Sequence, residues 1–266
     1  MRRYTSLCLF SALVCAFFAQ AQNISWRAIQ PGVEFASLTT GKMASGDSGT
    51  LYVVRVDPAR AKLTVALALE SQSKPRTAAE WCRTAGLSVA INVGMYQTDL
   101  LSNVGYLRHG SHVNNPRWNA DNAVLALNGS SPALWVDRDV DTRSLNNYDI
   151  VVQNLRLITK SRKNVWAPNA RQWSEAALAI DSKRRLLFLF TRAPWSMREF
   201  NDELLRLPLD VAGAMHLEGG PEASLSIHGG GVDLDLAGSF ETGFWPDDSN
   251  VKQWAIPNVL GVAKAK

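Results

Sequence analysis

Residues 215–224 read Met215-His216-Leu217-Glu218-Gly219-Gly220-Pro221-Glu222-Ala223-Ser224. The apolar run from Val211 to Leu217 predicts a buried strand, and the glycines and the proline after it predict a sharp turn. A second run, Ala223–His228, predicts the next strand. Glu218 therefore directly follows a core strand, where a polar group is held on a rigid scaffold.

Two other segments repeat this arrangement of an apolar strand that passes into a polar turn. They are Ala90-Ile91-Asn92-Val93-Gly94-Met95-Tyr96 and Val151-Val152-Gln153-Asn154. Glycine at a strand end allows a positive φ angle and a close approach of the backbone. The pattern therefore predicts one site, built where the three strands end.

Strand and helix signals alternate along the rest of the chain. The further predicted strands are 51–56, 63–69, 123–127, 176–180 and 186–191. The turn residues 57–60 predict that the first two of these strands form a hairpin. Thr77 with Glu80, and Ser196 with Glu199, are capping-box patterns that predict two helix starts. We therefore expect the α+β class, a single domain of mixed, largely antiparallel β-sheet with a few packed helices.

The N-terminus has the pattern of a secretory signal peptide. Arg2 and Arg3 precede an apolar run from Leu7 to Phe18, and Ala19-Gln20-Ala21 follows as a small-residue cleavage site. The alternative is an uncleaved anchor, but the run is shorter than the roughly 20 residues that a spanning helix needs. No later segment of the sequence is long and apolar enough to span a membrane.

This pattern divides the chain into three parts. We expect residues 1–21 to be a signal peptide cut after Ala21, residues 22–49 an N-terminal extension or strand, and residues 50–266 the functional domain. The expected location is therefore periplasmic or secreted. Without residues 1–21, Cys82 is the only cysteine, so no intrachain disulfide is expected, and we expect Cys82 to be a buried, unreactive thiol.

Charge gives no sign of an anionic macromolecular partner. The chain has 28 basic and 24 acidic residues, and the signal peptide holds two of the basic ones and no acidic one. The remaining excess of positive charge is small. We therefore expect no nucleic acid partner, and we expect no stable membrane span once the signal peptide is cleaved.

Four segments, in this order and at this spacing, resemble the phosphodiester glycosidase domain family. Its marks are A-x-N-G-G-F-[FY], a strand with a glycine-rich turn, T-A-[IL]-G-x-[DN] followed by an apolar strand, and L-D-G-G-x-S. The corresponding segments here are 90–96, 151–158, 176–190 and 217–224, and the resemblance covers roughly residues 50–262. The family contains the enzyme that removes N-acetylglucosamine to uncover mannose 6-phosphate, together with many exported bacterial proteins.

The resemblance implies an exported hydrolase that acts on a glycan-linked phosphodiester or a related glycosidic bond, with a carbohydrate or sugar-phosphate substrate. The chain departs from the family pattern at three places. Val93 stands where the family has a glycine, Glu175-Ala176 where it has R-T, and Glu218 where it has aspartate. These departures leave an alternative open, a non-catalytic glycan- or cell-envelope-binding protein on the same fold.

Glu218, Glu222 and His216 are the candidate catalytic residues. A carboxylate at the end of a core strand is partly desolvated, and such a group can act as a general acid or base. Glu222 would then supply the second carboxylate that glycoside hydrolysis uses, although it could equally be a solvated turn residue. His216 shares the face of Glu218 if the strand is regular. The structural alternative for Glu218 is that it accepts hydrogen bonds from its own turn.

The candidate substrate-binding residues are polar, aromatic or glycine positions at the strand ends and on the long loop 94–121: Asn92, Gly94, Tyr96, Gln153, Asn154, Arg192, Gly219, Gly220, Ser224, His109 and Arg108. Asn92 could instead hold the turn, and Tyr96 could be a core aromatic. Arg192 and Arg108 are candidates for neutralising a phosphate. No metal site is predicted, because His109 and His112 have no further ligand cluster near them. No cofactor is predicted, and a divalent cation is left open.

Overall fold

The computed structural model describes residues 23–42, 48–121, 123–128, 133–135 and 141–265. The predicted signal peptide and its cleavage site after Ala21 lie outside these residues. The described strands form three sheets, and every strand pair in them is antiparallel. Two α-helices accompany the sheets. The predicted fold class, a single α+β domain with largely antiparallel sheet, is confirmed.

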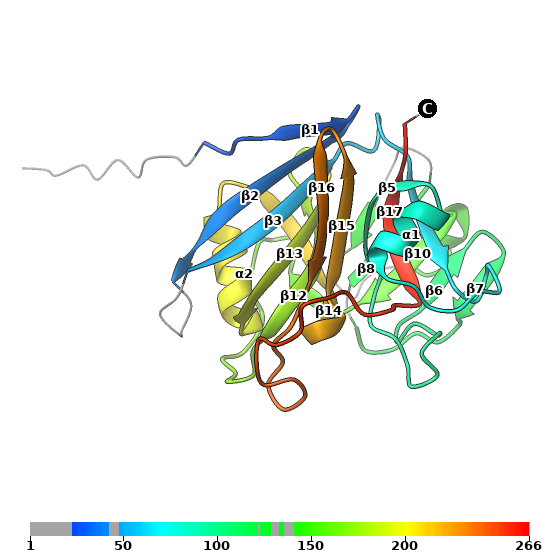
Figure 1. The fold of residues 1–266 in the computed structure, drawn as a ribbon. Coiled ribbons are helices and arrows are strands. Elements are labelled where there is room, and N and C mark those ends of the chain that lie inside the picture. The colour runs from blue at the N-terminus through cyan, green and yellow to red at the C-terminus, as the bar shows by residue number, and fades with distance from the viewer. Residues whose placement is uncertain (1–22, 43–47, 122, 129–132, 136–140, 266) are drawn as a thin grey trace, which may run out of the picture.

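A seven-stranded sheet forms one side of the molecule (Figure 1). Its order is β1-β2-β3-β13-β12-β14-β11. The strands are β1 (Arg27–Gln30), β2 (Val33–Lys42), β3 (Ser48–Val56), β13 (Leu186–Trp195), β12 (Trp173–Asp181), β14 (Val211–Gly219) and β11 (Arg156–Ile158). Residues 27–42, which the sequence placed in an N-terminal extension, thus belong to the same sheet as β3.

Two five-stranded sheets form the other side. The first contains, in order, β16 (Val232–Ala237), β15 (Ser224–Gly229), β5 (Leu87–Asn92), β17 (Asn258–Ala263) and β4 (Leu63–Leu67). The second contains β7 (His112–Asn115), β6 (Leu107–His109), β10 (Ile150–Asn154), β8 (Ala123–Leu127) and β9 (Ala133–Trp135). The short 3-10 helices η1 (Ser144–Asn147) and η2 (Gly220–Glu222) connect strands.

The main hydrophobic core lies between the sheets and takes residues from all three. In strand β12, successive side chains point to opposite faces of the sheet and pack into two different clusters. Ala176 and Leu178 face the main core, whereas Ala177 and Ala179 face a second cluster under helix α2 (Met197–Arg206). Full burial of a large apolar side chain contributes about 1.5–3 kcal/mol, so this double-sided packing fixes β12 in the middle of its sheet.

The helices begin where the sequence predicts. At helix α1 (Ala78–Thr84), Thr77 Oγ1 accepts from the Glu80 N–H at 3.1 Å and Glu80 Oε2 accepts from the Thr77 N–H at 2.9 Å, which completes the predicted capping box. At α2, Ser196 caps the Glu199 N–H, but the Glu199 carboxylate binds the Ser196 hydroxyl at 2.7 Å. Cys82 is buried in α1, as predicted, and burial raises the pKa of its thiol to about 12.

The predicted hairpin of residues 51–56 and 63–69 is wrong. β3 pairs with β2 and β13, whereas β4 pairs with β17 in a different sheet. The turn between them does form, with the Arg60 and Ala61 N–H groups bonded to the Asp57 carbonyl oxygen. It carries the chain from one sheet to the other, and the local sequence does not specify which strand becomes the partner.

The segment 94–121, expected to be a loop, contains the short hairpin β6–β7. His109 and His112 are direct partners across it. Among the helices that the structure describes, none has the length and apolar character that crossing a membrane requires.

Candidate active site

A cavity of about 300 Å³ lies at the end of β14, against the start of β12. Glu218 and His216 reach it from β14, and Trp173 reaches it from β12. The lining residues are Met95, Leu155, Trp166, Asn169, Arg171, Trp173, His216, Glu218, Gly219 and Glu241. Two of the candidate catalytic residues therefore line one hollow, which we call the Glu218 cavity.

Strand β14 aims these side chains by simple alternation. Met215 and Leu217 belong to the main core, so His216 and Glu218 face the other way. The register with β12 shifts at this point, since Ala176 opposes Glu218 while Ala177 opposes His216. A bulge of this kind commonly re-aims a side chain beside a site.

The two glycines after Glu218 are required by close contacts. A Cβ atom on Gly219 would lie 2.7 Å from Cδ1 of Trp173, so only glycine lets that indole close over the strand. Gly220 has a φ angle of +62°, and a Cβ atom there would lie 2.6 Å from Oε2 of Glu241. Both glycines thus shape the cavity through the side chains packed against them.

His216 forms a buried ion pair with Glu175. Nδ1 of His216 lies 2.7 Å from Oε1 of Glu175, and Trp173 Nε1 donates to Oε2 of the same carboxylate at 2.7 Å. Burial disfavours the charged imidazolium, but the Glu175 carboxylate outweighs this effect and raises the pKa of His216. Burial also raises the pKa of Glu175. The pair therefore holds its proton to higher pH than either isolated group would.

Glu218 is kept protonated at neutral pH. Burial, and then repulsion from Glu222, raise its pKa from 4.5 to about 8, although His216 acts in the opposite direction. The Gly219 N–H donates to Oε1 at 3.1 Å, so the structural role that the sequence left open for Glu218 is also present. A carboxyl group in this state can donate a proton to a leaving group.

Glu222, on η2, is held by Tyr96. The Tyr96 hydroxyl donates to Oε1 of Glu222 at 3.0 Å. Burial raises the pKa of Glu222, and the hydrogen bond from Tyr96 offsets only part of this rise. Burial, followed by the charge of Glu222, raises the pKa of Tyr96. Tyr96 is therefore a hydrogen-bond donor here, and Glu222 is a second carboxylate whose charge Glu218 senses.

Asn92 joins the end of β5 to the turn after β14. Its Nδ2 donates to the Glu222 carbonyl oxygen at 3.0 Å, and its Oδ1 accepts from the Ser224 N–H at 2.8 Å. Ser224 is itself buried and its hydroxyl donates to the same carbonyl oxygen at 3.2 Å. Both ends of the Asn92 amide are thus bonded to backbone, and the residue holds Glu222 and Ser224 in place.

The end of β10 is tied in by Asn154. Its Nδ2 donates to the Val93 carbonyl oxygen at 2.8 Å, and a Cβ atom on Gly94 would lie 2.5 Å from its Oδ1. Gln153 binds backbone groups of Asn119 and Asp121. The three strand ends therefore do meet, but their amide side chains bind backbone and do not line the Glu218 cavity.

Three predicted substrate-binding residues lie elsewhere. Arg192 binds the carbonyl oxygens of residues 237, 248 and 250, and Arg108 binds those of residues 110, 145 and 148. His109 Nδ1 lies 2.8 Å from Oε2 of Glu70. None of the three lines the Glu218 cavity.

The sequence interpretation missed the arginine and the tryptophans of the cavity. Arg171, with 60% of its side chain exposed, lies 3.7 Å from Glu241 across the opening. Trp166 and Trp173 supply flat apolar surface beside it. Glu175 had a detectable signal, because it is a carboxylate at the start of the apolar run 176–180. Arg171 and Trp166 had none, since they lie on an irregular segment.

Within the described residues, no group of three or more His, Cys, Asp or Glu side chains is arranged to hold a metal ion. The acidic groups around the cavity instead bind separate partners. Glu175 binds His216, Glu222 binds Tyr96, and Glu241 lies near Arg171. The arrangement combines one protonated carboxyl, one cation at the opening and two aromatic walls.

Comparison with known families gives a match over most of the chain. A family model described as phosphodiester glycosidase matches residues 85–263. No curated protein matches the chain.

Several solved structures resemble this fold, among them the following three. One is a hypothetical protein from Synechocystis, which is 12% identical to this chain and superposes with a TM-score of 0.68. The match covers 88% of this chain, and this chain spans 63% of the Synechocystis protein. The catalytic domain of zebrafish N-acetylglucosamine-1-phosphodiester alpha-N-acetylglucosaminidase, auto-inhibited by its pro-peptide, is 13% identical with a TM-score of 0.65, covering 91% of this chain and 88% of that one. A Burkholderia pseudomallei protein described as exported is 9% identical with a TM-score of 0.51, covering 85% and 76%.

Proposed function

The chain belongs to the phosphodiester glycosidase family, and we propose that it hydrolyses a sugar phosphodiester in the Glu218 cavity. The observation that carries the proposal is that the buried carboxyl group of Glu218 and the guanidinium of Arg171 line the same cavity. A proton donor serves a leaving oxygen, and a guanidinium at the opening serves a phosphate.

The walls of the cavity fit the sugar part of such a substrate. Trp166 and Trp173 offer flat apolar faces, and Asn169 offers an amide for hydroxyl groups. Aromatic side chains combine a large apolar surface with a fixed geometry, which suits the apolar face of a sugar ring. Arg171 is tethered to Glu241 at 3.7 Å and is largely exposed, so it can turn toward a phosphate at little cost.

The reaction follows from these groups. Water adds to the anomeric carbon, the bond from that carbon to the phosphate oxygen breaks, and Glu218 gives its proton to the leaving phosphate monoester. Glu222 does not line the cavity, but its charge acts on Glu218, and as the second carboxylate it is assigned to take a proton from the water, as in glycoside hydrolysis by a carboxyl pair. The products are a free sugar and a phosphate monoester, and the proton taken by Glu222 balances the one that Glu218 gives.

His216 and Glu175 act on Glu218 and do not contact the bond that breaks. The positive charge that Glu175 stabilises on His216 lowers the pKa of Glu218, whereas burial and Glu222 raise it. These opposing effects bring the pKa close to neutral pH, where a general acid is most effective.

Export is part of the proposal. The predicted signal peptide places the protein in the periplasm or outside the cell, where glycan-linked phosphodiesters of the envelope occur. The similarity of fold to a Burkholderia pseudomallei protein described as exported is consistent with this location. Mass spectrometry of the secreted protein would test it, since a mature N-terminus at Gln22 is expected.

The substrate class is tested with three matched compounds and the purified protein. They are a sugar 1-phosphodiester, the corresponding methyl glycoside without phosphate, and a phosphodiester without sugar. Turnover of the first compound alone is expected, because only it engages both Arg171 and the aromatic walls. Equal turnover of the methyl glycoside would contradict the phosphate requirement. Binding of the sugar phosphodiester without any turnover would favour the non-catalytic alternative.

A further inference from the structure

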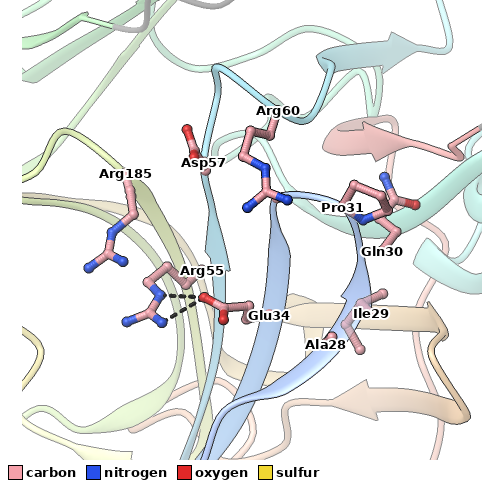
Figure 2. A pocket seen from close by; sticks show the side chains of 10 residues that line it. Ala28, Ile29, Gln30, Pro31, Glu34, Arg55, Asp57, Arg60 and Arg185 are labelled. Atoms are coloured by element: carbon pink, nitrogen blue, oxygen red, sulfur yellow. Dashed lines mark hydrogen bonds and ion pairs between the residues drawn. The ribbon is translucent and has the colours of Figure 1, made fainter.

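A second hollow, of about 560 Å³, lies at the other end of the seven-stranded sheet (Figure 2). The turn between β1 and β2 closes one side of it, and the end of β3 with the turn before β13 closes the other. Three of its lining side chains are arginines, Arg55, Arg60 and Arg185. We call it the arginine pocket.

The arginine pocket is separate from the Glu218 cavity. Strand β12 connects the two, because Glu175 near its start binds His216 and Asp181 at its end holds Arg185. At about 3.3 Å per residue, Glu175 and Asp181 are roughly 20 Å apart along the strand. A ligand of the arginine pocket is thus not a group bound in the proposed hydrolytic site.

Arg55 is fixed in place on two sides. Its Nε and Nη2 donate to Oε2 of Glu34 at 2.9 and 2.6 Å, as Figure 2 shows, and its guanidinium lies 3.8 Å from the ring centroid of Trp26. These contacts engage one edge of the guanidinium and leave Nη1 for a ligand. A guanidinium already held in position loses little conformational entropy when it binds an anion.

Arg185 is fixed in the same way. Its Nε and Nη2 both lie 2.7 Å from Oδ2 of Asp181. Asp181 is buried and also accepts backbone N–H groups of Lys183 and Arg185, so it cannot turn away. Arg185 therefore presents a fixed positive group from the turn between β12 and β13.

Arg60 is the unpaired charge of the pocket. Its side chain is exposed and has no hydrogen-bond or ion-pair partner among the residues that the structure describes. Gly32 packs directly on it, because a Cβ atom there would lie 2.6 Å from the Arg60 Cβ. The pocket also holds Glu34 and Asp57, but Glu34 is bound to Arg55 and Asp57 accepts the Ala59 N–H at 3.0 Å. Among the lining residues that the structure describes, no carboxylate forms an ion pair with Arg60.

We propose that the arginine pocket binds a phosphate group. The three arginines come from β3, the turn after it and the position directly before β13, and all three line the hollow drawn in Figure 2. Arginine is the side chain best suited to phosphate oxygens, since its donors form a planar fork. A tetrahedral phosphate has oxygens for several forks, whereas a carboxylate is satisfied by one.

Titration calorimetry at low ionic strength tests the proposal with three probes. Inorganic phosphate tests for a free anion, glucose 6-phosphate for a phosphorylated sugar, and polyphosphate for a phosphate-bearing chain. Arg60→Ala is expected to weaken every interaction that the wild-type protein shows by about tenfold or more, because a charge-assisted contact is lost. Arg60→Glu is expected to abolish it.

Arg83→Ala is the matched control, since it removes an exposed arginine from α1 outside the pocket. It is expected to bind as the wild-type protein does. The exposed position of Arg60 means that its variants keep the fold, which circular dichroism would check. Equal phosphate affinity in the wild type and Arg60→Ala would overturn the proposal, as would the absence of wild-type binding to all three probes.

Discussion

Nδ1 of His216 lies 2.7 Å from Oε1 of Glu175, and both side chains are almost completely buried. Glu218 lies two residues after His216 on β14, and both side chains line the Glu218 cavity. The charge on this pair and the protonation of Glu218 are therefore coupled. This coupling relates the packing of β12 against β14 to the chemistry of the site.

Removing one member of the pair should be costly. Glu175→Gln leaves a buried imidazole without its anion, and we expect the free energy of unfolding to fall by about 3 kcal/mol. The Glu175→Gln/His216→Gln double variant should lose clearly less than the sum of the two single variants. Urea unfolding of the four proteins measures this. Strictly additive losses would show that the two side chains do not interact.

Glu218 should make stability fall as the pH rises. Its pKa is raised from 4.5 to about 8 in the folded protein, so the folded state binds more protons than the unfolded state between these values. The stabilisation is complete below the lower pKa and is lost as the pH rises through the upper one. Glu218→Gln cannot lose a proton, so its melting temperature relative to wild type should be higher at about pH 9 than at about pH 5. A constant difference would contradict a raised pKa.

The same group should set the alkaline limit of activity. If protonated Glu218 is the general acid, kcat falls above a pH of about 8. Repulsion from Glu222 contributes to this pKa, so Glu222→Gln should shift the alkaline limit of its residual activity to lower pH. The pH dependence of kcat for both proteins tests this. An unchanged or higher limit in the variant would contradict the proposed coupling.

Arg171 should act on binding of the phosphate. Arg171→Ala is expected to raise KM for a sugar phosphodiester by about tenfold or more, because one charge-assisted contact is lost. Its side chain is 60% exposed, so the melting temperature should stay unchanged. Arg83→Ala, which changes an exposed arginine on α1, is the control and should leave KM as in wild type. An unchanged KM in Arg171→Ala would place the phosphate elsewhere.

Local sequence patterns predicted the parts of the fold that depend on local interactions. The capping residue Thr77, the apolar strand that ends at Asn92 and the position of Glu218 at the end of a core strand are all present. These features depend on neighbours a few residues apart. The hairpin predicted for 51–56 and 63–69 failed because strand partners are chosen by the packing of whole sheets.

The site was predictable only in part, because a local pattern does not specify which distant segments come together. Strand alternation was enough to predict that Glu218 and His216 lie on one face of β14. Asn92 was found as a strand-end residue, but its bonds to backbone of Glu222 and Ser224 connect positions about 130 residues apart. Arg171 comes from a segment without periodicity, so no local pattern could bring it to Glu218.

The most direct measurement is the turnover number of Glu218→Gln on a sugar 1-phosphodiester, compared with Glu70→Gln and the wild-type protein. Glu70 is an exposed carboxylate outside the cavity, so its variant makes the same chemical change without touching the site. We predict that Glu218→Gln lowers kcat by about 100-fold or more, as expected for a lost general acid, while Glu70→Gln stays near wild type. A kcat in Glu218→Gln equal to that of the wild type would contradict the central role of Glu218.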